Sequence, residues 1–330
     1  MAKKRILVPG GAGYIGSHTV KALVESGADV VVVDNLETGF RQSVDPATGF
    51  YQGDIRDKAF LDSVFDKEHI DGVIHFAAYS QVGQSMQTPL DYYDNNVNGT
   101  RVLLASMLEH GVKNIVFSST AATYGEPDNI PILESDRTEP TSAYGATKLA
   151  MEQMMSWCTT AYGLNYVSLR YFNACGAHES GQIGEAHNPE THLIPLILQV
   201  PGGKEPCIKI FGNDYPTRDG TCVRDYIHVM DLAEAHILAA EYLFAGGKSD
   251  VFNLGNGVGF TVEEVVATAQ EVVGAHIPTE IVPRRPGDPA QLIASSEKAK
   301  TVLGWKPSRN DLNTIISSAW NWHKTHPNGY

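Results

Sequence analysis

A glycine-rich stretch near the amino terminus constrains the fold of this chain more than any other feature. Residues 10–16 read Gly-Gly-Ala-Gly-Tyr-Ile-Gly, between a short apolar segment at 5–8 and a helical apolar pattern over 15–26. Glycines in this context allow a tight turn and a close approach of the backbone to a phosphate, which the helix amino terminus attracts. The stretch therefore predicts a loop that holds the pyrophosphate of a dinucleotide.

Polar and small residues at the ends of the next predicted strands fit the rest of such a ligand. Asp34 and Asn35 follow a predicted strand at 29–33, where a carboxylate can accept from a ribose hydroxyl and repels a 2′-phosphate, which favours NAD over NADP. Small residues at strand ends let a flat cofactor pass close to the backbone, although singly such positions more often serve packing. The positions of this kind are Gly53, Asp54, Ile55, Phe76, Ala77 and Ala78.

Short apolar runs alternate with amphipathic segments through the first half of the chain, a pattern typical of βαβ units. We expect an α/β fold with a Rossmann-type, doubly wound parallel sheet, formed by residues 1–173 plus about 230–255. Predicted strands are 5–8, 29–33, 72–76, 114–118, 165–170 and 251–254, with helices at 15–26, 92–110 and 231–243. A smaller mixed α/β substrate lobe should comprise about 174–229 and 256–330, with helices at 193–199, 262–273 and 312–323 and extended segments at 208–211 and 280–283.

Composition excludes several other classes of function. The 330 residues include 25 Lys and Arg against 38 Asp and Glu, a formal net charge of −13, which argues against nucleic acid or an anionic membrane as partner. No apolar run approaches the ~20 residues of a membrane span, and the amino terminus is too short in apolar residues for a signal peptide, so we expect a cytoplasmic protein. The widely spaced cysteines predict reduced thiols and no metal site; they are Cys158, Cys175, Cys207 and Cys222.

A tyrosine and a lysine provide the candidate catalytic chemistry. Tyr144 and Lys148 are four residues apart at the start of a predicted helix and therefore share one face. An ammonium at ~4 Å in an effective dielectric of ~20 contributes about 4 kcal/mol, enough to lower a phenol pKa from ~10 to ~7 before desolvation is subtracted. A second cation, such as an oxidised nicotinamide, would offset the free energy lost to desolvation of the ammonium and the phenolate. Tyr144 could then serve as base for an alcohol, with Thr120 sharing the proton or holding the oxygen. Such a pair alone would more often lie exposed on a surface helix, but the dinucleotide loop upstream in the same chain favours the catalytic interpretation.

Longer strings give the chain a family resemblance. The segments GGAGYIGSH (10–18), DNL (34–36), YYDNNVNGT (92–100) and YGATK (144–148) resemble the extended short-chain dehydrogenase/reductase family. The downstream strings YFN (171–173), FGNDYPT (211–217), VRDYIHV (223–229) and PRRPGD (283–288) are more specific and resemble the UDP-glucose 4-epimerase branch. The resemblance spans nearly the whole chain. It implies a tightly bound NAD that oxidises C4 of a UDP-hexose and, after the 4-keto sugar turns, reduces it from the other side, interconverting UDP-glucose and UDP-galactose.

The resemblance also implies a role for each matching residue. Tyr144 would be the base, Lys148 would tune it and anchor the nicotinamide ribose, and Thr120 would bind the substrate beside Tyr144. The residues implied to line NAD are Gly10, Gly13, Tyr14, Ile15, Gly16, Asp34, Asn35, Asp54, Ile55, Phe76, Ala77, Ala78, Asn95, Ser118, Lys148 and Phe172. Those implied to hold the UDP-hexose are Asn173, Leu193, Phe211, Arg224, Tyr226, Arg285 and Asp288, with Leu292 at the gate of the sugar pocket.

Two departures and two alternatives remain open at this stage. Some relatives carry a lysine where this chain has Ser80, which affects cofactor retention, and a tyrosine where it has Leu292, which leaves room for N-acetylated sugars. A 4,6-dehydratase would need an acid and a base directly after Thr120, where this chain has two alanines, and a non-catalytic dinucleotide sensor would not need Tyr144. The resemblance further implies a homodimer through helices around 103–108 and 151–157, whose apolar residues would equally suit an internal core.

Overall fold

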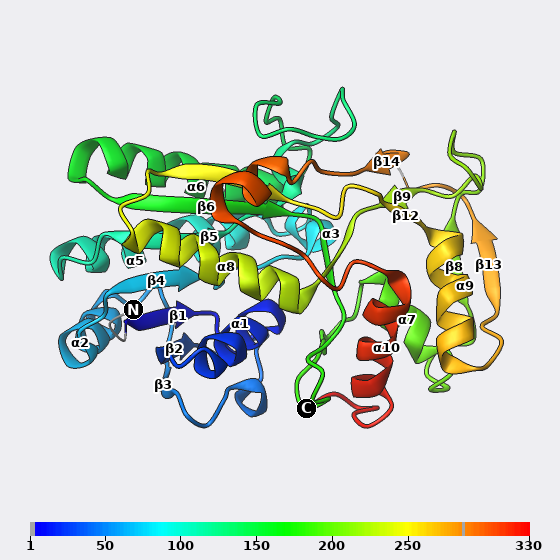
Figure 1. The fold of residues 1–330 in the computed structure, drawn as a ribbon, viewed down its shortest axis with the longest axis horizontal. Coiled ribbons are helices and arrows are strands. Elements are labelled where there is room, and N and C mark those ends of the chain that lie inside the picture. Colours follow the sequence, from blue (N-terminus) through cyan, green and yellow to red (C-terminus); the bar gives the residue numbers. More distant parts are fainter. Residues whose placement is uncertain (1–3, 286–287) are drawn as a thin grey trace.

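Runs of β-branched residues form a central seven-stranded parallel sheet in the computed structural model, which describes residues 4–285 and 288–330 (Figure 1). The strand order is β11-β6-β5-β4-β1-β2-β3. The strands are β1 (Arg5–Pro9), β2 (Asp29–Asp34), β3 (Gly49–Gln52), β4 (Gly72–His75), β5 (Asn114–Ser118), β6 (Asn165–Tyr171) and β11 (Asp250–Leu254). The predicted doubly wound sheet is confirmed, including the late strand β11, which pairs with β6 after a long excursion of the chain.

Helices cover both faces of this sheet, because alternate strand residues are apolar on both sides. Ile6 and Val8 pack in one core with α1 (Tyr14–Glu25) and α8 (Val229–Phe244). Leu7 packs in a second core, together with residues of α2 (Lys58–Glu68), α5 (Gly99–Glu109) and α6 (Ala143–Tyr162). Figure 1 shows α5 and α6 on one side of the sheet and α1 and α8 on the other.

The helix predicted over residues 92–110 is interrupted in the structure. The segment consists of α4 (Pro89–Tyr92), a π-helical turn η2 (Tyr93–Asn98) and α5. Within the turn, the fully buried Asn96 accepts from the backbone N–H of Tyr79 at 2.8 Å and donates to the hydroxyl of Thr147 at 3.1 Å. Such turns occur often at functional sites, and this one fixes the neighbouring Asn95 against α6.

A second lobe is built from short strands and three helices (Figure 1). The helices α7 (Leu193–Gln199), α9 (Val262–Val273) and α10 (Leu312–His323) begin and end as predicted and share one apolar core. The strands form three small sheets, with orders β10-β7, β12-β9-β14 and β13-β8. They are β7 (Asn173–Cys175), β8 (Ile208–Phe211), β9 (Val223–Arg224), β10 (Tyr226–His228), β12 (Phe260–Thr261), β13 (Thr279–Val282) and β14 (Gln291–Leu292).

Short helical turns complete the chain: η1 (Arg41–Ser43), α3 (Val82–Ser85), η3 (Ala121–Thr123) and η4 (Ala299–Leu303). The last of these returns to the first lobe, where Ala299, Leu303 and Trp305 are buried in the core beside α8. The indole of Trp305 donates to the carbonyl of Asp231 at 2.9 Å. The carboxyl-terminal part of the chain therefore contributes to the cores of both lobes, through Trp305 in the first and α10 in the second.

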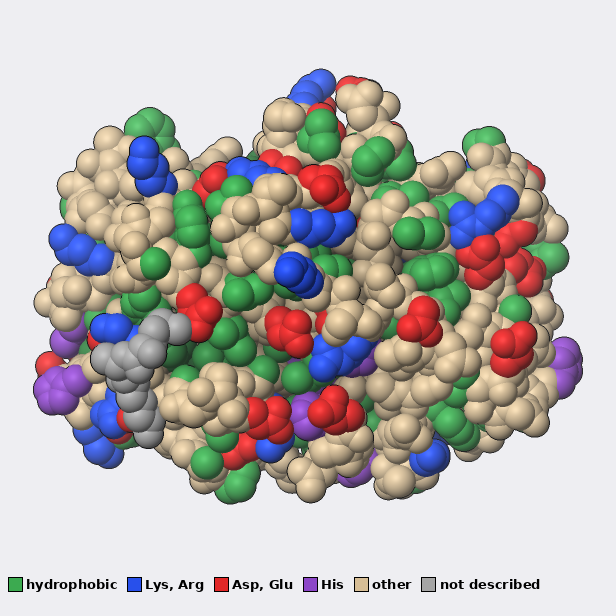
Figure 2. All heavy atoms as spheres, viewed as in Figure 1, with side chains coloured by type: hydrophobic (Ala, Val, Ile, Leu, Met, Phe, Trp, Pro, Cys, Tyr) green, Lys and Arg blue, Asp and Glu red, His purple; other side chains and the backbone are tan. Residues whose placement is uncertain are grey.

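Charged side chains of both signs are interspersed on the face drawn in Figure 2. Among the described residues, none of the helices combines the length and apolarity needed to traverse a bilayer.

Candidate functional site

The turn between β1 and α1 accepts only glycine at two positions. Gly10 has a φ of +80°, and a Cβ placed there would lie 2.4 Å from the backbone nitrogen of Ala77. A Cβ at Gly16 would lie 2.1 Å from the carbonyl oxygen of Gly10. By contrast, a Cβ at Gly13 would have 3.4 Å to its nearest neighbour, so this side of the turn is open. The turn is therefore a shallow cradle of backbone in front of the amino terminus of α1.

The Asp34 carboxylate ties this turn to the end of β2. Its two oxygens accept from the backbone N–H groups of Ala12 and Leu36, each at 2.9 Å. Burial raises the pKa of Asp34, and these two hydrogen bonds oppose the rise. Each carboxylate oxygen has a second acceptor site, so Asp34 can shape the loop and still bind a ribose hydroxyl.

A cavity of about 90 Å³ opens over this edge of the sheet. Ten of the sixteen residues implied for NAD lie in its lining: Gly10, Gly13, Asp34, Asn35, Asp54, Ile55, Phe76, Ala77, Ala78 and Asn95. The sequence reasoning did not single out Glu37 and Tyr79, which also line the cavity and are joined by a hydrogen bond of 2.7 Å. The backbone cradle, the acid at the end of β2 and the small residues at strand ends together fit a dinucleotide.

The other six residues implied for NAD lie outside that lining. Tyr14, Ile15 and Gly16 form the first turn of α1, whose N–H groups lack intrahelical partners. The Tyr14 hydroxyl donates to the carbonyl of Gly176 at 2.6 Å, so its side chain binds the second lobe. The remaining three, Ser118, Lys148 and Phe172, lie around the start of α6 and the ends of β5 and β6.

The amino terminus of α6 lies against the turn that carries Thr120. Ser142 caps the helix by accepting from the N–H of Gly145 at 3.1 Å. A Cβ at Gly145 would lie 2.5 Å from the carbonyl oxygen of Ala122, so a glycine permits this close approach. The Thr120 hydroxyl accepts from the N–H of Ala122 at 3.1 Å and lies near enough to Tyr144 to lower the pKa of its phenol. The structure thus brings together the hydroxyl and the tyrosine that the sequence placed in different segments.

The titration of Tyr144 and Lys148 differs from the sequence expectation. Burial raises the pKa of Tyr144 to about 12, more than the hydrogen bond from Thr120 lowers it. Burial also lowers the pKa of Lys148 to about 7, because its ammonium is enclosed. Lys148 Nζ donates to the carbonyl of Ser118 at 2.8 Å and lies 5.9 Å from the centre of the Tyr144 ring. The protein alone therefore does not lower the tyrosine pKa.

A buried ion pair that sequence reasoning missed lies one turn beyond Lys148. Glu152 accepts from Arg170 Nε at 3.0 Å, and both residues are at most 6% exposed. The carboxylate of Glu152 raises the pKa of Lys148, opposing the effect of burial. The i, i+4 spacing from Lys148 was the available signal, since it places Glu152 on the same helix face.

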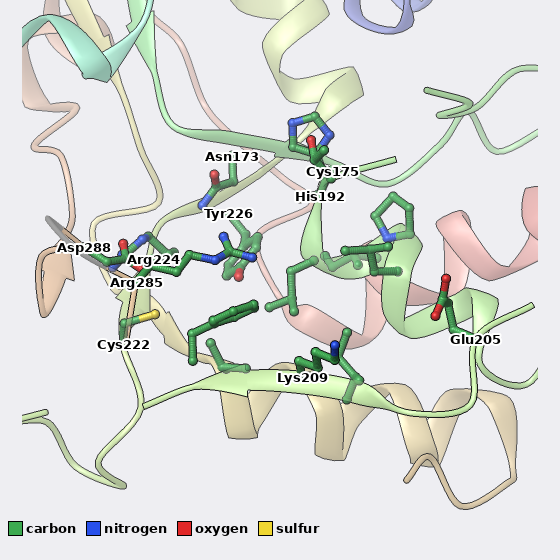
Figure 3. A pocket seen from close by; sticks show the side chains of 18 of the residues that line it. Asn173, Cys175, His192, Glu205, Lys209, Cys222, Arg224, Tyr226, Arg285 and Asp288 are labelled. Atoms are coloured by element: carbon green, nitrogen blue, oxygen red, sulfur yellow. The ribbon is translucent and has the colours of Figure 1, made fainter. Parts of the chain in front are cut away.

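A second cavity, of about 390 Å³, lies in the smaller lobe (Figure 3). Seven implied substrate residues line it: Asn173, Leu193, Phe211, Arg224, Tyr226, Arg285 and Asp288. Arg224 and Asp288 form an ion pair, and the Arg285 guanidinium lies 3.8 Å from the centre of the Phe211 ring. Pro286 and Gly287, which belong to the same string in the sequence, lie outside the described residues. Two guanidinium groups beside an aromatic ring suit a nucleoside diphosphate.

Asp225 connects the strand that carries Arg224 and Tyr226 to neighbouring backbone segments. It is fully buried and accepts from the backbone N–H of Asn256 at 2.7 Å and of Ala294 at 3.3 Å. Burial raises the pKa of Asp225 to about 6. Because it stands between Arg224 and Tyr226, the alternation of an extended chain turns these two neighbours toward the cavity.

Leu292 connects the second lobe to the Thr120 turn. In β14 it stands opposite Arg224 of β9, and its side chain packs on the apolar cluster of Ala121, Tyr124 and Ile132. Ser80, the other departure, is exposed and follows Tyr79 of the smaller cavity. Thr120 and Tyr144 themselves line neither cavity, but the contacts of Asn96 and Leu292 join their surroundings to both.

Comparisons with known proteins agree with this arrangement. Residues 6–255 match the model of the NAD dependent epimerase/dehydratase family. The chain is 61% identical over 325 residues to the UDP-glucose 4-epimerase of Halalkalibacterium halodurans, covering 98% of this chain and 97% of the relative. A crystal structure of a UDP-glucose 4-epimerase superposes with a TM-score of 0.98 at 56% identity, covering 99% of each chain.

The UDP-glucose 4-epimerase of Bifidobacterium longum, solved in complex with NAD⁺ and UDP, gives a TM-score of 0.92 at 41% identity over 99% of this chain and 100% of that chain. The fold, the two cavities and these similarities lead to one assignment: the chain belongs to the NAD dependent epimerase/dehydratase family and, within it, to the UDP-glucose 4-epimerases.

Proposed function

We propose that this protein interconverts UDP-glucose and UDP-galactose by transient oxidation at C4 of the hexose. One observation carries the proposal: Thr120 and Tyr144 lie close together, and their chain neighbours contact Asn96, which is bonded to Tyr79 of the smaller cavity, and Leu292, which pairs with Arg224 of the larger one. A reaction that moves hydrogen between a nucleotide-linked sugar and a nicotinamide needs a proton-transferring group at this junction. The relative from Bifidobacterium longum, crystallised with NAD⁺ and UDP, supports the same pair of ligands.

NAD would be held by the backbone cradle and the acids around it. Gly10, Gly13 and the first turn of α1 would face the pyrophosphate, and Asp34 would accept from the adenosine ribose. When bound, NAD supplies the site that takes a hydride from C4 and later returns it. Tight retention follows because the ligand would be enclosed by the loop, η2 and the strand ends together.

Tyr144 would hold the proton of the C4 hydroxyl. On oxidation, the C4–H bond breaks, the hydroxyl proton moves to Tyr144 Oη and a C4 ketone forms; on reduction the same proton returns to the oxygen. Thr120 would hold the substrate oxygen in line with Tyr144. Because burial keeps the pKa of Tyr144 at about 12, it becomes a base only when positive charge is added nearby. A charged Lys148 is one such source.

UDP would be held by side chains of the smaller lobe. Arg224 and Arg285 would contact the pyrophosphate, and Phe211 would stack on the uracil. Asp288, already paired with Arg224, would accept from the uridine ribose. The sugar would then extend toward Thr120, past Leu292.

The experiment for the proposed function uses the purified full chain. It should convert UDP-galactose to UDP-glucose with no added cofactor, as seen by chromatography of the nucleotide sugars. Tyr144→Phe should keep the bound NAD and reduce turnover by about 10²-fold or more, because it removes the proton-transferring group. Cofactor-loaded protein that leaves UDP-galactose unchanged would reject the epimerase function, and full activity of Tyr144→Phe would reject the role of the tyrosine.

Leu292 supports a second substrate class, the N-acetylated UDP-hexoses. Its side chain packs on the cluster beside Thr120, where a tyrosine would fill more of the space. We therefore propose that UDP-N-acetylgalactosamine is also a substrate. Incubation with this sugar and chromatography of the products tests it; product from UDP-galactose alone would restrict the enzyme to unsubstituted hexoses.

The chain also offers a surface for self-association. Of the apolar residues on the two helices implied for a dimer, Leu103, Met107, Met151 and Met155 are buried within the chain, whereas Trp157 is 74% exposed. We propose a homodimer in which Trp157 is covered by a second copy. Sedimentation of wild-type protein should give a dimer and Trp157→Glu a monomer; a monomeric wild type would reject it.

The lobe boundaries and cellular location are proposals of the same kind. The sheet supports a cofactor part made of residues 1–173 and about 230–255, with about 174–229 and 256–330 as the substrate part. Because Trp305 is buried in the core of the sheet lobe, we propose that the segment around it be counted with the first part. The four cysteines are free, which supports a reducing, cytoplasmic location.

A further inference from the structure

Four side chains with no role in the proposed function converge just before α7, and only one of them, His192, borders a cavity described above. They follow the spacing Glu-x-His-x-x-Glu-x-His and are Glu185, His187, Glu190 and His192. One ligand atom from each, an imidazole nitrogen or a carboxylate oxygen, lies within 4.8 Å of all the others. The prediction that the chain has no metal site depended on the spacing of the cysteines, none of which belongs to this group.

The spacing of these atoms fits a tetrahedral ion. His187 Nδ1 and His192 Nδ1 lie 3.1 Å and 2.9 Å from the same oxygen, Oε1 of Glu185. His187 Nδ1 lies 3.7 Å from Oε2 of Glu190, and His192 Nδ1 lies 3.2 Å from the other oxygen, Oε1. Zinc bonded at about 2.0–2.1 Å to nitrogen and oxygen in a tetrahedron places its ligand atoms about 3.3 Å apart, in the middle of these values.

Two atoms at the centre of the cluster lack a hydrogen bond, whereas Nδ1 of His192 is hydrogen-bonded to Oε1 of Glu190 at 3.2 Å. Glu185 is only 4% exposed, and its Oε1 has no hydrogen-bond partner although two imidazole nitrogens lie close to it. Nδ1 of His187 is likewise buried without a hydrogen-bond partner. A buried carboxylate oxygen without a hydrogen bond is costly, and a cation bonded to all four atoms would remove that cost.

Neighbouring groups hold two of the four residues in place. Oε1 of Glu190 accepts from the backbone N–H groups of Thr191 at 2.8 Å and His192 at 2.9 Å. The Tyr14 ring packs edge-on against the His187 ring, with centroids 6.1 Å apart. Partners of this kind orient metal ligands in known sites.

We propose that Glu185, His187, Glu190 and His192 form a structural site for a zinc ion. Two imidazoles and two carboxylates are ligands that zinc accepts in a closed four-coordinate site. The ion would fix residues 185–192. This segment packs against Tyr14, the first residue of α1, and leads directly into Leu193, which lines the larger cavity. His192 itself lies at the border of that cavity (Figure 3). The site would therefore link the dinucleotide loop to the nucleotide pocket without contacting the reacting atoms.

The test measures metal in the intact protein. The full chain, produced without a histidine tag, is incubated with zinc chloride, desalted and analysed by mass spectrometry for metal content. We expect about one zinc per chain, and a higher midpoint of thermal unfolding with zinc than after treatment with a chelator. The double variant His187→Ala/His192→Ala should retain at least about tenfold less zinc. His276→Ala removes an exposed histidine that is hydrogen-bonded to Gln270, and should bind zinc like the wild type.

Two results would overturn the site. The first is wild-type protein that retains no zinc after desalting and unfolds at the same temperature with and without it; the cluster would then be two ion pairs. The second is equal zinc binding by wild type and the double variant, which would place the metal elsewhere. Should the double variant fail to fold, Glu190→Gln keeps the side-chain shape and should still weaken zinc binding. Because neither readout uses turnover, failure of the site is distinguishable from failure of the epimerase proposal.

Discussion

The two cavities are constructed in different ways. The smaller one, over the sheet, is lined largely by backbone and small residues from the ends of consecutive strands, and its shape depends on glycines such as Gly10. The larger one is lined by aliphatic, aromatic and charged side chains from six separate segments, including Arg224 and Arg285. In the first, chain geometry creates the site; in the second, side chains do.

This difference determines how each site responds to substitution. A backbone cradle fails when any side chain enters it, because the backbone cannot move aside without disturbing the sheet. A pocket of side chains loses only the contacts of the residue that is changed. Substitutions in the two cavities and between them test this difference.

The largest effect is expected for Gly10→Ala. The new Cβ would overlap the backbone of Ala77 at a φ of +80°, which costs about 3 kcal/mol or more and lowers NAD affinity by about 100-fold or more. The NAD released from the purified variant on acid treatment measures this loss. Gly27→Ala is the matched control, since Gly27 has a φ of +84° with open space around it. Equal loss of NAD from both variants would mean that the cradle is not the cause.

Arg285→Ala should weaken substrate binding and leave the cofactor in place. Loss of hydrogen bonds to a pyrophosphate costs about 1.5–3 kcal/mol, so KM for UDP-galactose should rise about 10- to 100-fold with the NAD content unchanged. Arg284→Ala is the control, because Arg284 instead pairs with Asp214 at 2.7 Å and stacks over Tyr215. If both variants raise KM equally, the pocket does not depend on individual side chains.

Lys148, at the junction of the two regions, should make stability depend on pH. Burial lowers the pKa of Lys148 from 10.5 to about 7, so between these pH values the unfolded chain binds a proton that the folded chain does not. Stability therefore rises with pH in that window. From pH 7 to pH 9 the wild type should gain about 2 kcal/mol relative to Lys148→Met.

Urea unfolding of cofactor-free protein at several pH values measures this difference. The exposed Lys113 provides the control, and Lys113→Met should follow the wild-type slope. Parallel curves for wild type and Lys148→Met would show that the ammonium is hydrated in the folded chain.

The smallest effect is expected for Leu292→Tyr. A larger side chain beside the Thr120 turn should reduce kcat/KM for UDP-N-acetylgalactosamine relative to UDP-galactose by about tenfold. Ile293→Val alters the next side chain in the sequence and should leave the ratio unchanged. An unchanged ratio in Leu292→Tyr would exclude Leu292 from the sugar pocket.

The sequence predicts the smaller cavity better than the larger one, because backbone geometry follows from local sequence patterns whereas a pocket of side chains joins residues far apart in the chain. The glycine loop and Asp34 are close together in the chain, so strand, turn and helix patterns locate them directly. No spacing connects Arg224 with Arg285, and only the family resemblance places them together. The π-turn at Asn96 was missed because its apolar spacing is that of an ordinary helix. The raised pKa of Tyr144 was missed because burial depends on tertiary packing.

The path of the chain has a consequence for engineering and evolution. It leaves the sheet after Tyr171, returns at Val229, departs again beyond Leu254, comes back at Ala299 and leaves finally after Trp305. Neither half is thus one continuous piece of the gene, and no single crossover could graft a foreign sugar-recognition module onto this scaffold. Exchanging individual side chains is the more direct route to a new specificity, because transfer of a whole lobe would require several crossovers at once.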